Sequence, residues 1–296
     1  MLARMLRFTI ALQMIAGAAL GFWLTVCIAP AWTLTGMLVA ALALPLTSAV
    51  LTVVYSCTVS RANEPTGLWW RAVIGEALAG IRVFLLRQPW AFAPPRVQPA
   101  RGAPAGIPVV LVHGYVCNRR LWDDTTPALR AQGHTVLALN LEPVFASIDD
   151  YALLVEQAVH TLRKHTGQEQ VALVGHSMGG LAIRAWMRAY GTAQAACAIT
   201  LGTPHAGTRI KTIVPTPNAV QMAWQSDWLQ ALAASENETM RGLFRIALSP
   251  QDNIVFPQRA QTLAGVTPVI FEGLGHLQLC TEPAVIQWLC SELRSL

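Results

Sequence analysis

The chain contains 53 consecutive residues, from Phe8 to Ser60, without a single Asp, Glu, Lys, Arg or His. One membrane crossing needs about 20 apolar residues, so this run is long enough for two crossings joined by a short turn. We expect the turn at Pro30-Ala31-Trp32. Residues 1–60 are therefore predicted to form two transmembrane helices arranged as a helical hairpin.

A cleaved signal peptide is the alternative interpretation of this segment, because Arg4 and Arg7 give it a basic start. The apolar stretch from Phe8 to Ile28, however, exceeds the roughly 7–15 residues of a signal sequence, and a second apolar span follows it. Arginines flank the predicted hairpin on both sides while its turn carries no charge, which favours placing both ends in the cytoplasm. We expect an integral protein of a bacterial-type inner (cytoplasmic) membrane that contacts membrane lipids through the hairpin.

The charge balance is basic, with a formal net charge of +5. Arginines that follow the hairpin account for much of this excess and would face anionic lipid headgroups. No aromatic-basic motif or recognisable nucleic-acid module accompanies the charge, so nucleic acid is not an expected partner. The six cysteines show neither metal-site nor disulfide-framework spacing, and we expect no metal and no other cofactor.

Residues 61–106 connect the hairpin to the rest of the chain. Gly67 to Trp90, with two tryptophans near its start, is predicted to be an interfacial amphipathic helix, or else an ordinary helix packed on the following domain. Residues 91–106 are rich in Pro and Gly and indicate a linker of restricted flexibility. The domain boundary is expected there, with one large domain over residues 107–296.

That domain alternates short apolar runs with helical patterns. The runs are continuously apolar, as expected of strands buried on both faces of a sheet. They lie at residues 109–112, 136–139, 171–174, 198–201, 244–248 and 269–271. The alternation predicts an α/β fold built on a mainly parallel, doubly wound sheet.

One pentapeptide, Gly175-His176-Ser177-Met178-Gly179, stands between the run at 171–174 and a helical pattern at 181–190. A serine hydroxyl is a poor nucleophile at neutral pH, so an enzyme must hold it next to a base and clear of its neighbours. A sharp turn from strand to helix does this, and glycines without a Cβ at 175 and 179 let the two elements approach closely. Ser177 is therefore a candidate nucleophile.

This arrangement resembles the nucleophile elbow of the α/β-hydrolase superfamily, most closely that of its lipases and esterases. The resemblance covers roughly residues 107–295 and implies the α/β-hydrolase fold. In that family the chain order is nucleophile, acid, base, which leaves His205 and His276 as candidate bases. We prefer His276, since Gly273-Leu274-Gly275-His276-Leu277 follows the last expected strand, and interpret His205 as a structural or pocket residue.

The resemblance also places the acid and the oxyanion hole. Asp252 follows the strand at 244–248 and is the preferred acid, with Asp227 and Glu272 as competitors and an ordinary turn as the alternative. The oxyanion donors would be the backbone N–H groups of Met178 and Tyr115. His113 and Gly114 would shape the turn before Tyr115, and His176 is expected to point away from the Ser177 side chain.

An insertion at about 207–242 is apolar enough to cover the site as a small cap or lid, or simply to pack as a helical excursion. The site residues together predict a membrane-anchored serine ester hydrolase, lipase- or carboxylesterase-like, that acts on an ester or lipid through an acyl-enzyme. A membrane acyltransferase or thioesterase would use the same chemistry and is the first alternative. A non-catalytic hydrolase-fold membrane scaffold is the second.

Overall fold

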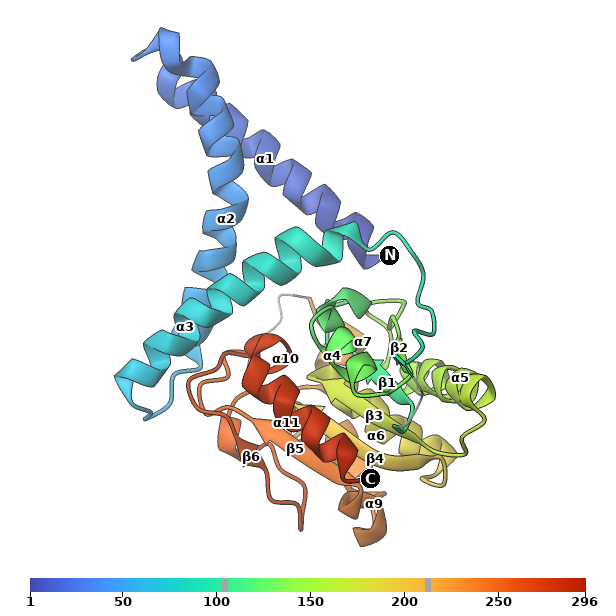
Figure 1. Ribbon diagram of the computed structural model, residues 1–296. Coiled ribbons are helices and arrows are strands. Elements are labelled where there is room, and N and C mark those ends of the chain that lie inside the picture. The colour runs from blue at the N-terminus through green and yellow to red at the C-terminus, as the bar shows by residue number, and fades with distance from the viewer. Residues whose placement is uncertain (103–105, 211–213) are drawn as a thin grey trace.

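The computed structural model describes residues 1–102, 106–210 and 214–296 (Figure 1). Residues 103–105 of the predicted linker and 211–213 of the predicted insertion lie outside the described residues. The N-terminal part comprises α1 (Leu2–Val26), the 3-10 turn η1 (Pro30–Trp32), α2 (Thr33–Val59), α3 (Thr66–Gly80), the π-helical turn η2 (Ile81–Arg87) and the 3-10 turn η3 (Gln88–Trp90).

The remainder alternates strands and helices, as the apolar runs predict. Its strands are β1 (Val109–Val112), β2 (Val136–Ala138), β3 (Val171–His176), β4 (Ala195–Leu201), β5 (Phe244–Leu248) and β6 (Val269–Ile270). Its helices and 3-10 turns are η4 (Arg119–Trp122), α4 (Thr125–Ala131), α5 (Ile148–Thr166), α6 (Met178–Tyr190), α7 (Pro217–Gln221), α8 (Asp227–Ala234), α9 (Glu238–Gly242), η5 (Gln258–Ala260), α10 (Gln278–Thr281) and α11 (Pro283–Arg294).

The strands form one sheet in the order β2-β1-β3-β4-β5-β6, and every neighbouring pair is parallel. Because the strands run the same way, their carboxyl ends meet at one edge of the sheet, where open α/β sheets bind their ligands. The predicted parallel, doubly wound sheet is confirmed.

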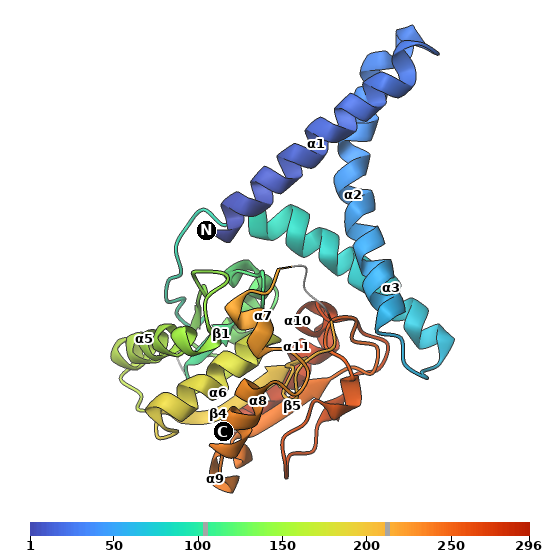
Figure 2. The same ribbon diagram turned by 180° about the vertical axis from the view of Figure 1, so that it is seen from behind.

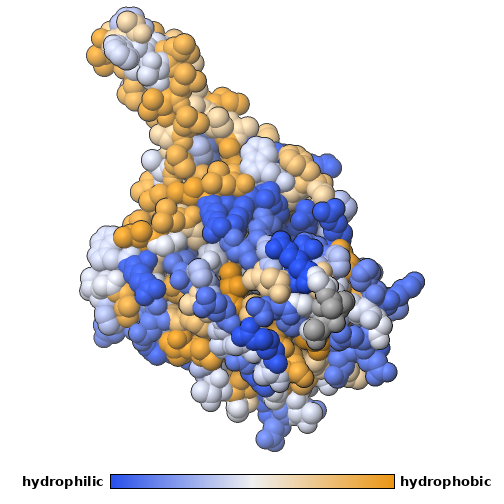
Figure 3. Space-filling model, in the orientation of Figure 1, coloured by the Kyte–Doolittle hydropathy of each residue, from blue (hydrophilic) through white to orange (hydrophobic). Residues whose placement is uncertain are grey.

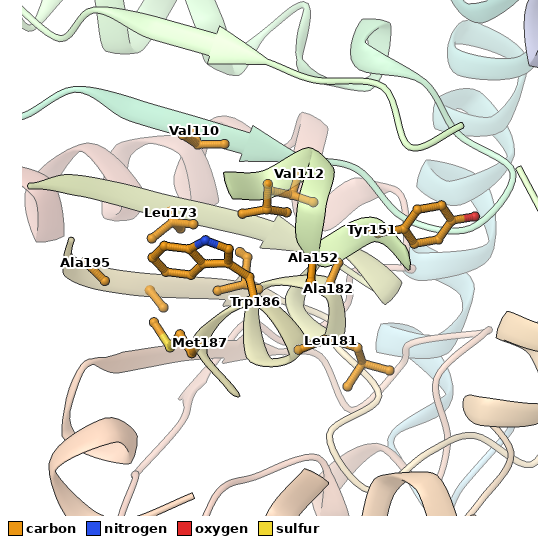
Figure 4. Close-up of a cluster of buried hydrophobic side chains, with 14 of the residues drawn as sticks. Val110, Val112, Tyr151, Ala152, Leu173, Leu181, Ala182, Trp186, Met187 and Ala195 are labelled. Atoms are coloured by element: carbon orange, nitrogen blue, oxygen red, sulfur yellow. The ribbon is translucent and has the colours of Figure 1, made fainter. Parts of the chain in front are cut away.

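Each face of the sheet carries its own core. Val109 and Leu111 of β1 pack with α4, α10 and α11 on one face, while Val110 and Val112 pack with α5 and α6 on the other. Figure 4 shows the second cluster, in which Trp186 of α6 lies near Leu173 of β3 and Ala195 of β4. Strands buried on both faces explain the continuously apolar runs.

The run at 269–271 departs from that expectation. Val269 and Ile270 are each 39% exposed, because β6 is the last strand of the sheet and pairs only with β5. The prediction that this strand is buried on both faces is therefore wrong. An edge strand can be as apolar in sequence as a central one, so composition alone does not separate them.

The first two helices form a hairpin joined at Pro30–Trp32, as expected (Figures 1 and 2). Their backbones touch near the turn: a Cβ added at Gly17 would lie 2.3 Å from the Ala40 carbonyl oxygen, and one at Gly21 would lie 2.3 Å from that of Gly36. Small residues four apart permit this close helix contact. Both helices are long and apolar enough to cross a membrane, and most of their apolar side chains are exposed (orange in Figure 3).

Toward the sheet, α1 and α2 diverge, and α3 with its continuation through η2 and η3 connects their ends, so that the helices form a triangle (Figure 1). The face of α3 that includes Ala72, Val73 and Glu76 is buried. Its opposite face exposes Trp70, Ile74 and Leu78. The helix therefore packs on the following domain, while its exposed apolar face leaves the interfacial interpretation as a prediction.

Candidate active site

Ser177 occupies a sharp turn between β3 and α6, with φ 54° and ψ −127°. A non-glycine residue with positive φ is strained and persists only when its surroundings fix it. Those surroundings are tight: a Cβ at Gly175 would lie 2.5 Å from the Gly180 nitrogen, and one at Gly179 would lie 2.1 Å from the Val112 carbonyl oxygen. The two flanking glycines thus allow the strand, the helix and β1 to meet around the serine.

His276 and Asp252 form a buried pair. The His276 Nδ1 donates to Asp252 Oδ2 at 2.7 Å, which leaves Nε2 as the proton acceptor of the neutral ring. The second carboxylate oxygen, Oδ1, accepts from the backbone N–H groups of Ile254 and Val255, each at 2.8 Å. The carboxylate is therefore held from both sides and fixes the orientation of the imidazole.

Electrostatics around the imidazole favour its protonated form. Burial by itself lowers the pKa of His276, but the charge and hydrogen bond of Asp252, with a further contribution from Glu76, outweigh it and raise the pKa above its usual value. A base with a raised pKa accepts a proton more readily. Ser177 and His276 line the same cavity, although the structure records no hydrogen bond from the Ser177 hydroxyl to any described residue.

The turn after β1 lies directly against the elbow. A Cβ at Gly114 would be 2.8 Å from the Ser177 Cβ. His113 braces this turn: its Nδ1 donates to the Gly114 carbonyl at 2.9 Å, and its Nε2 accepts from the Leu141 N–H at 2.9 Å. Burial lowers the pKa of His113 to about 4, so the ring is neutral. Among the described residues, neither the Tyr115 nor the Met178 backbone N–H has an acceptor.

His176 packs against His276 and lines the same cavity as Ser177. Its Nε2 donates to the His276 carbonyl at 3.0 Å, and the two rings lie 4.5 Å apart. Burial lowers the pKa of His176 well below its usual value, so it stays neutral beside His276. His176 thus connects the turn at Ser177 to the loop that carries His276. The sequence motif alone does not reveal this contact.

A cavity of about 480 Å³ opens onto these groups. The residues that line this cavity at the carboxyl edge of the sheet are Gly114, Tyr115, Cys117, His176, Ser177, Asn253, Ile254, His276 and Leu277. His205, Asp227 and Glu272 are not among its described lining residues. His205 instead hydrogen-bonds Thr200 Oγ1 at 3.0 Å and borders a separate cavity beside Arg184. In the part of the chain that the structure describes, no three His, Cys, Asp or Glu side chains are grouped to hold a metal ion.

A family model described as the alpha/beta hydrolase fold matches residues 107–249. Residues 107–249 belong to the α/β-hydrolase superfamily. The match includes the elbow, and we refer to residues 107–296 as the hydrolase domain. Asp252 and His276 lie beyond the matched residues but occupy loops at the same edge of the sheet as Ser177.

Solved structures share this fold at low sequence identity. A lipase of Bacillus licheniformis in its mature form has a TM-score of 0.60 at 14% identity, and the similarity covers 68% of this chain and 99% of that one. Lipase B of Aspergillus fumigatus has a TM-score of 0.56 at 16% identity, covering 67% of this chain and 56% of that one. At such identities the likeness establishes the fold.

The N-terminal helices also line the cavity at Ser177. The sequence did not predict that they contribute to the site. Fourteen of the described lining residues of the cavity belong to these helices. They are Leu6, Thr9, Ile10 and Gln13 of α1, Pro45, Ser48, Ala49, Thr52, Val53 and Ser56 of α2, and Glu76, Gly80, Phe84 and Leu85 of α3 and η2.

Glu76 of α3 also supports the loop that carries His276. Its carboxylate accepts from the Leu277 N–H at 2.9 Å and from the Gln278 N–H at 3.2 Å. Burial raises the pKa of Glu76 to about 7, against the opposing effects of these N–H groups and of His276. The signal in the sequence was a single acidic residue within the otherwise apolar and basic segment from Gly67 to Trp90.

Two further hydrogen bonds connect α2 and its C-terminal end to the loop that follows β5. Ser56 Oγ accepts from the Asn253 amide at 2.8 Å, and the Asn253 side-chain oxygen accepts from the His276 N–H at 3.0 Å. The Gln258 amide donates both to the Ser60 carbonyl at 3.0 Å and to the Asp252 carbonyl at 2.8 Å. The N-terminal helices thus contact the supports of both Asp252 and His276.

The insertion at 207–242 contributes little to the cavity in its described part. Ile210 is its one described lining residue. Farther along, α7, α8 and α9 follow, and Met222, Leu229 and Met240 are buried in the core cluster shared with α6. The described helices of this insertion pack on α5 and α6 of the hydrolase domain.

Proposed function

We propose that the protein is a membrane-anchored serine ester hydrolase, lipase- or carboxylesterase-like, with Ser177, Asp252 and His276 as its catalytic triad. The observation that carries the proposal is the buried His276–Asp252 pair, 2.7 Å apart, in the cavity that Ser177 also lines. A nucleophile, a base and an acid that orients the base are the parts that acyl transfer requires. Two of the similar solved structures are named as lipases, which agrees with this reaction class.

In the first half of the reaction, His276 Nε2 takes the Ser177 hydroxyl proton as Oγ attacks the ester carbonyl carbon. The carbonyl oxygen becomes an oxyanion that accepts hydrogen bonds from the Met178 and Tyr115 N–H groups, each contributing about 3–4 kcal/mol to transition-state stabilisation. The imidazolium then protonates the leaving alcohol as the carbon–oxygen bond breaks, and the acyl group remains on Ser177. The Asp252 carboxylate stabilises the imidazolium throughout.

In the second half, water replaces the alcohol. His276 takes a proton from the water as the water oxygen attacks the acyl carbon. It then gives that proton to Ser177 Oγ as the carboxylic acid leaves. His113 and His176 hold the surrounding turns as neutral groups. The buried rings flanking the site therefore do not compete with His276 for the proton.

The membrane part of the proposal rests on the exposed apolar surface of α1 and α2 and on the arginines at both ends of the hairpin. Hydrocarbon would cover that surface, and the charge pattern favours the hydrolase domain on the cytoplasmic side. Protease treatment of oriented inner-membrane vesicles tests the side. Digestion of the hydrolase domain is expected when the cytoplasmic face is outward, and protection in that preparation would reverse the orientation.

Labelling with a fluorophosphonate tests the enzymatic proposal directly. The detergent-purified full chain is expected to bind the probe and to hydrolyse a short aryl ester, and Ser177→Ala is expected to abolish both. Ser291→Ala, at an exposed serine of α11, is the matched control and should retain both. Labelling that persists in Ser177→Ala would show that another residue is the nucleophile.

A further inference from the structure

The walls of the cavity at Ser177 come in part from α1 and α2. Leu6 and Ile10 of α1 line one side, and Ala49 and Val53 of α2 line another. These residues belong to the two helices that are long and apolar enough to cross a membrane. The helices proposed as an anchor therefore also form part of the interior surface of the active site.

The cavity is bounded at both ends of the space between α1 and α2. Toward the hairpin turn, the Gln13 amide donates to Ser48 Oγ at 3.0 Å and joins the two helices. Toward the sheet, Phe84 and Leu85 of η2 line it. An acyl chain that reaches Ser177 through this region would lie between the Gln13–Ser48 contact and the η2 side chains.

Between the boundaries the cavity reaches the molecular surface. Thr9 of α1 and Thr52 of α2 line the cavity and are themselves exposed. Nearby side chains that do not line it, including Leu12 and Leu51, are exposed and apolar. Figure 3 shows this hydrophobic character over much of the visible hairpin. The opening therefore lies on a surface suited to lipid hydrocarbon.

The polar side chains of the α2 wall are compatible with an apolar occupant. Thr52 Oγ1 donates to the Ser48 carbonyl at 2.8 Å, and Ser48 Oγ donates to the Pro45 carbonyl at 3.0 Å. Hydroxyls that bond their own helix backbone need no partner from a ligand. What remains for the occupant is a mainly hydrocarbon surface in a volume typical of ligand pockets.

We propose that α1 and α2 form the acyl-binding site, and that the substrate is a membrane lipid ester whose acyl chain enters between them directly from the bilayer. This rests on the proposed function, because it assigns the substrate of the same Ser177 site. The acyl carbons beyond the ester lie against Ile10, Val53 and Phe84, while the ester carbonyl lies at Ser177. The hairpin thereby selects the length of the acyl chain as well as anchoring the enzyme.

Chain-length selectivity of Ile10 variants tests this assignment in the full-length protein. Each methylene buried in an apolar site contributes roughly fourfold to binding. Ile10→Trp, which removes space for a few methylenes, is expected to lower the ratio of kcat/KM for a hexadecanoyl over a butanoyl aryl ester by at least tenfold. Ile10→Ala is expected to leave that ratio equal or higher. The matched control is Leu12→Trp, on the outward side of α1, which should keep the wild-type ratio.

A photoreactive phosphonate tests the path without any substitution in the hairpin. The probe carries a long alkyl chain with a diazirine near its end and is attached to Ser177 in lipid nanodiscs. Photolysis is expected to crosslink residues 6–13 or 45–56. Crosslinks confined to residues 207–242, together with unchanged selectivity in Ile10→Trp, would overturn the acyl-site assignment while leaving the hydrolase proposal intact. Absence of Ser177 labelling and of short-ester hydrolysis would instead contradict the proposed function itself.

Discussion

The hydrolase domain and the N-terminal helices differ in how far they bury their apolar side chains. Val110 in β1 is fully buried, at 0% exposure, whereas Phe8 in α1 is 71% exposed. The domain buries its apolar side chains between the sheet and the helices on both of its faces, while most apolar side chains of the hairpin are exposed. The two regions therefore follow opposite burial rules.

The same two regions share the candidate active site. The hydrolase domain supplies the proposed nucleophile, base and acid, and the N-terminal helices supply cavity walls and hydrogen bonds to the supporting loops. Chemistry and access are thus divided between them. Substitutions in the hydrolase domain should act on the reaction itself, and substitutions in the N-terminal helices should act on positioning and selectivity.

The largest effect is expected inside the hydrolase domain. Asp252→Asn keeps the side-chain shape but removes the charge that stabilises the imidazolium and allows the ring to adopt the wrong tautomer, so kcat should fall on the order of 10⁴-fold. Steady-state hydrolysis of a short aryl ester measures this. The variant should remain folded by circular dichroism, and a loss below tenfold would assign the acid to another residue.

A smaller but substantial effect is expected from α3. Glu76→Ala leaves the buried Leu277 and Gln278 N–H groups without their acceptor, at a cost of about 1–3 kcal/mol for each unsatisfied group. The base loop should shift, and kcat should fall roughly 10- to 100-fold while KM for a short ester changes little. The matched control is Glu64→Ala, at a carboxylate that pairs with Arg259 near the surface. Equal effects from both variants would mean that Glu76 has no special role in positioning His276.

A few-fold effect is expected from α2. Ser56→Ala removes the hydroxyl that accepts from Asn253, worth about 1 kcal/mol, and should lower kcat by roughly fivefold. Thr58→Ala, at an exposed hydroxyl bonded to its own helix, is the control and should not change kcat. If neither substitution changes kcat, the Ser56–Asn253 contact does not position the base.

The smallest effect is a shift in pH dependence. The base must be neutral to accept the serine proton, so kcat/KM should fall as the pH drops through the raised pKa of His276. Glu76→Gln removes a negative charge that favours the imidazolium, so the acid limb of the profile should move to lower pH. Profiles of kcat/KM for wild type and Glu76→Gln at low salt measure this, and movement to higher pH would contradict the assigned direction.

Local sequence rules accounted for much of the molecule. The elbow depends on close neighbours such as Gly175 and Gly179, and the apolar runs correctly indicated a parallel sheet with two buried faces. The hairpin turn at Pro30–Trp32 was likewise encoded locally. The assignments of Asp252, Tyr115 and the remaining site residues, and the cytoplasmic location, stay predictions that the experiments above address.

Features that depend on tertiary packing were not accessible from the sequence. Ile10 and Leu12 are similar apolar residues of one helix, and only the position of α2 and the hydrolase domain makes one of them a cavity wall. The exposure of β6 follows from its place at the sheet edge. Glu76 finds its partners about two hundred positions away in the chain, a separation that no local pattern reports.

The position of Leu6 and Ile10 in the cavity wall has a practical consequence for making this protein. An expression design that removes α1 as if it were an export signal would also remove one side of the active site. Bulky fusions placed before residue 6 would adjoin that wall. Purification tags therefore belong after Leu296, which is exposed, so that the recombinant protein keeps this cavity wall.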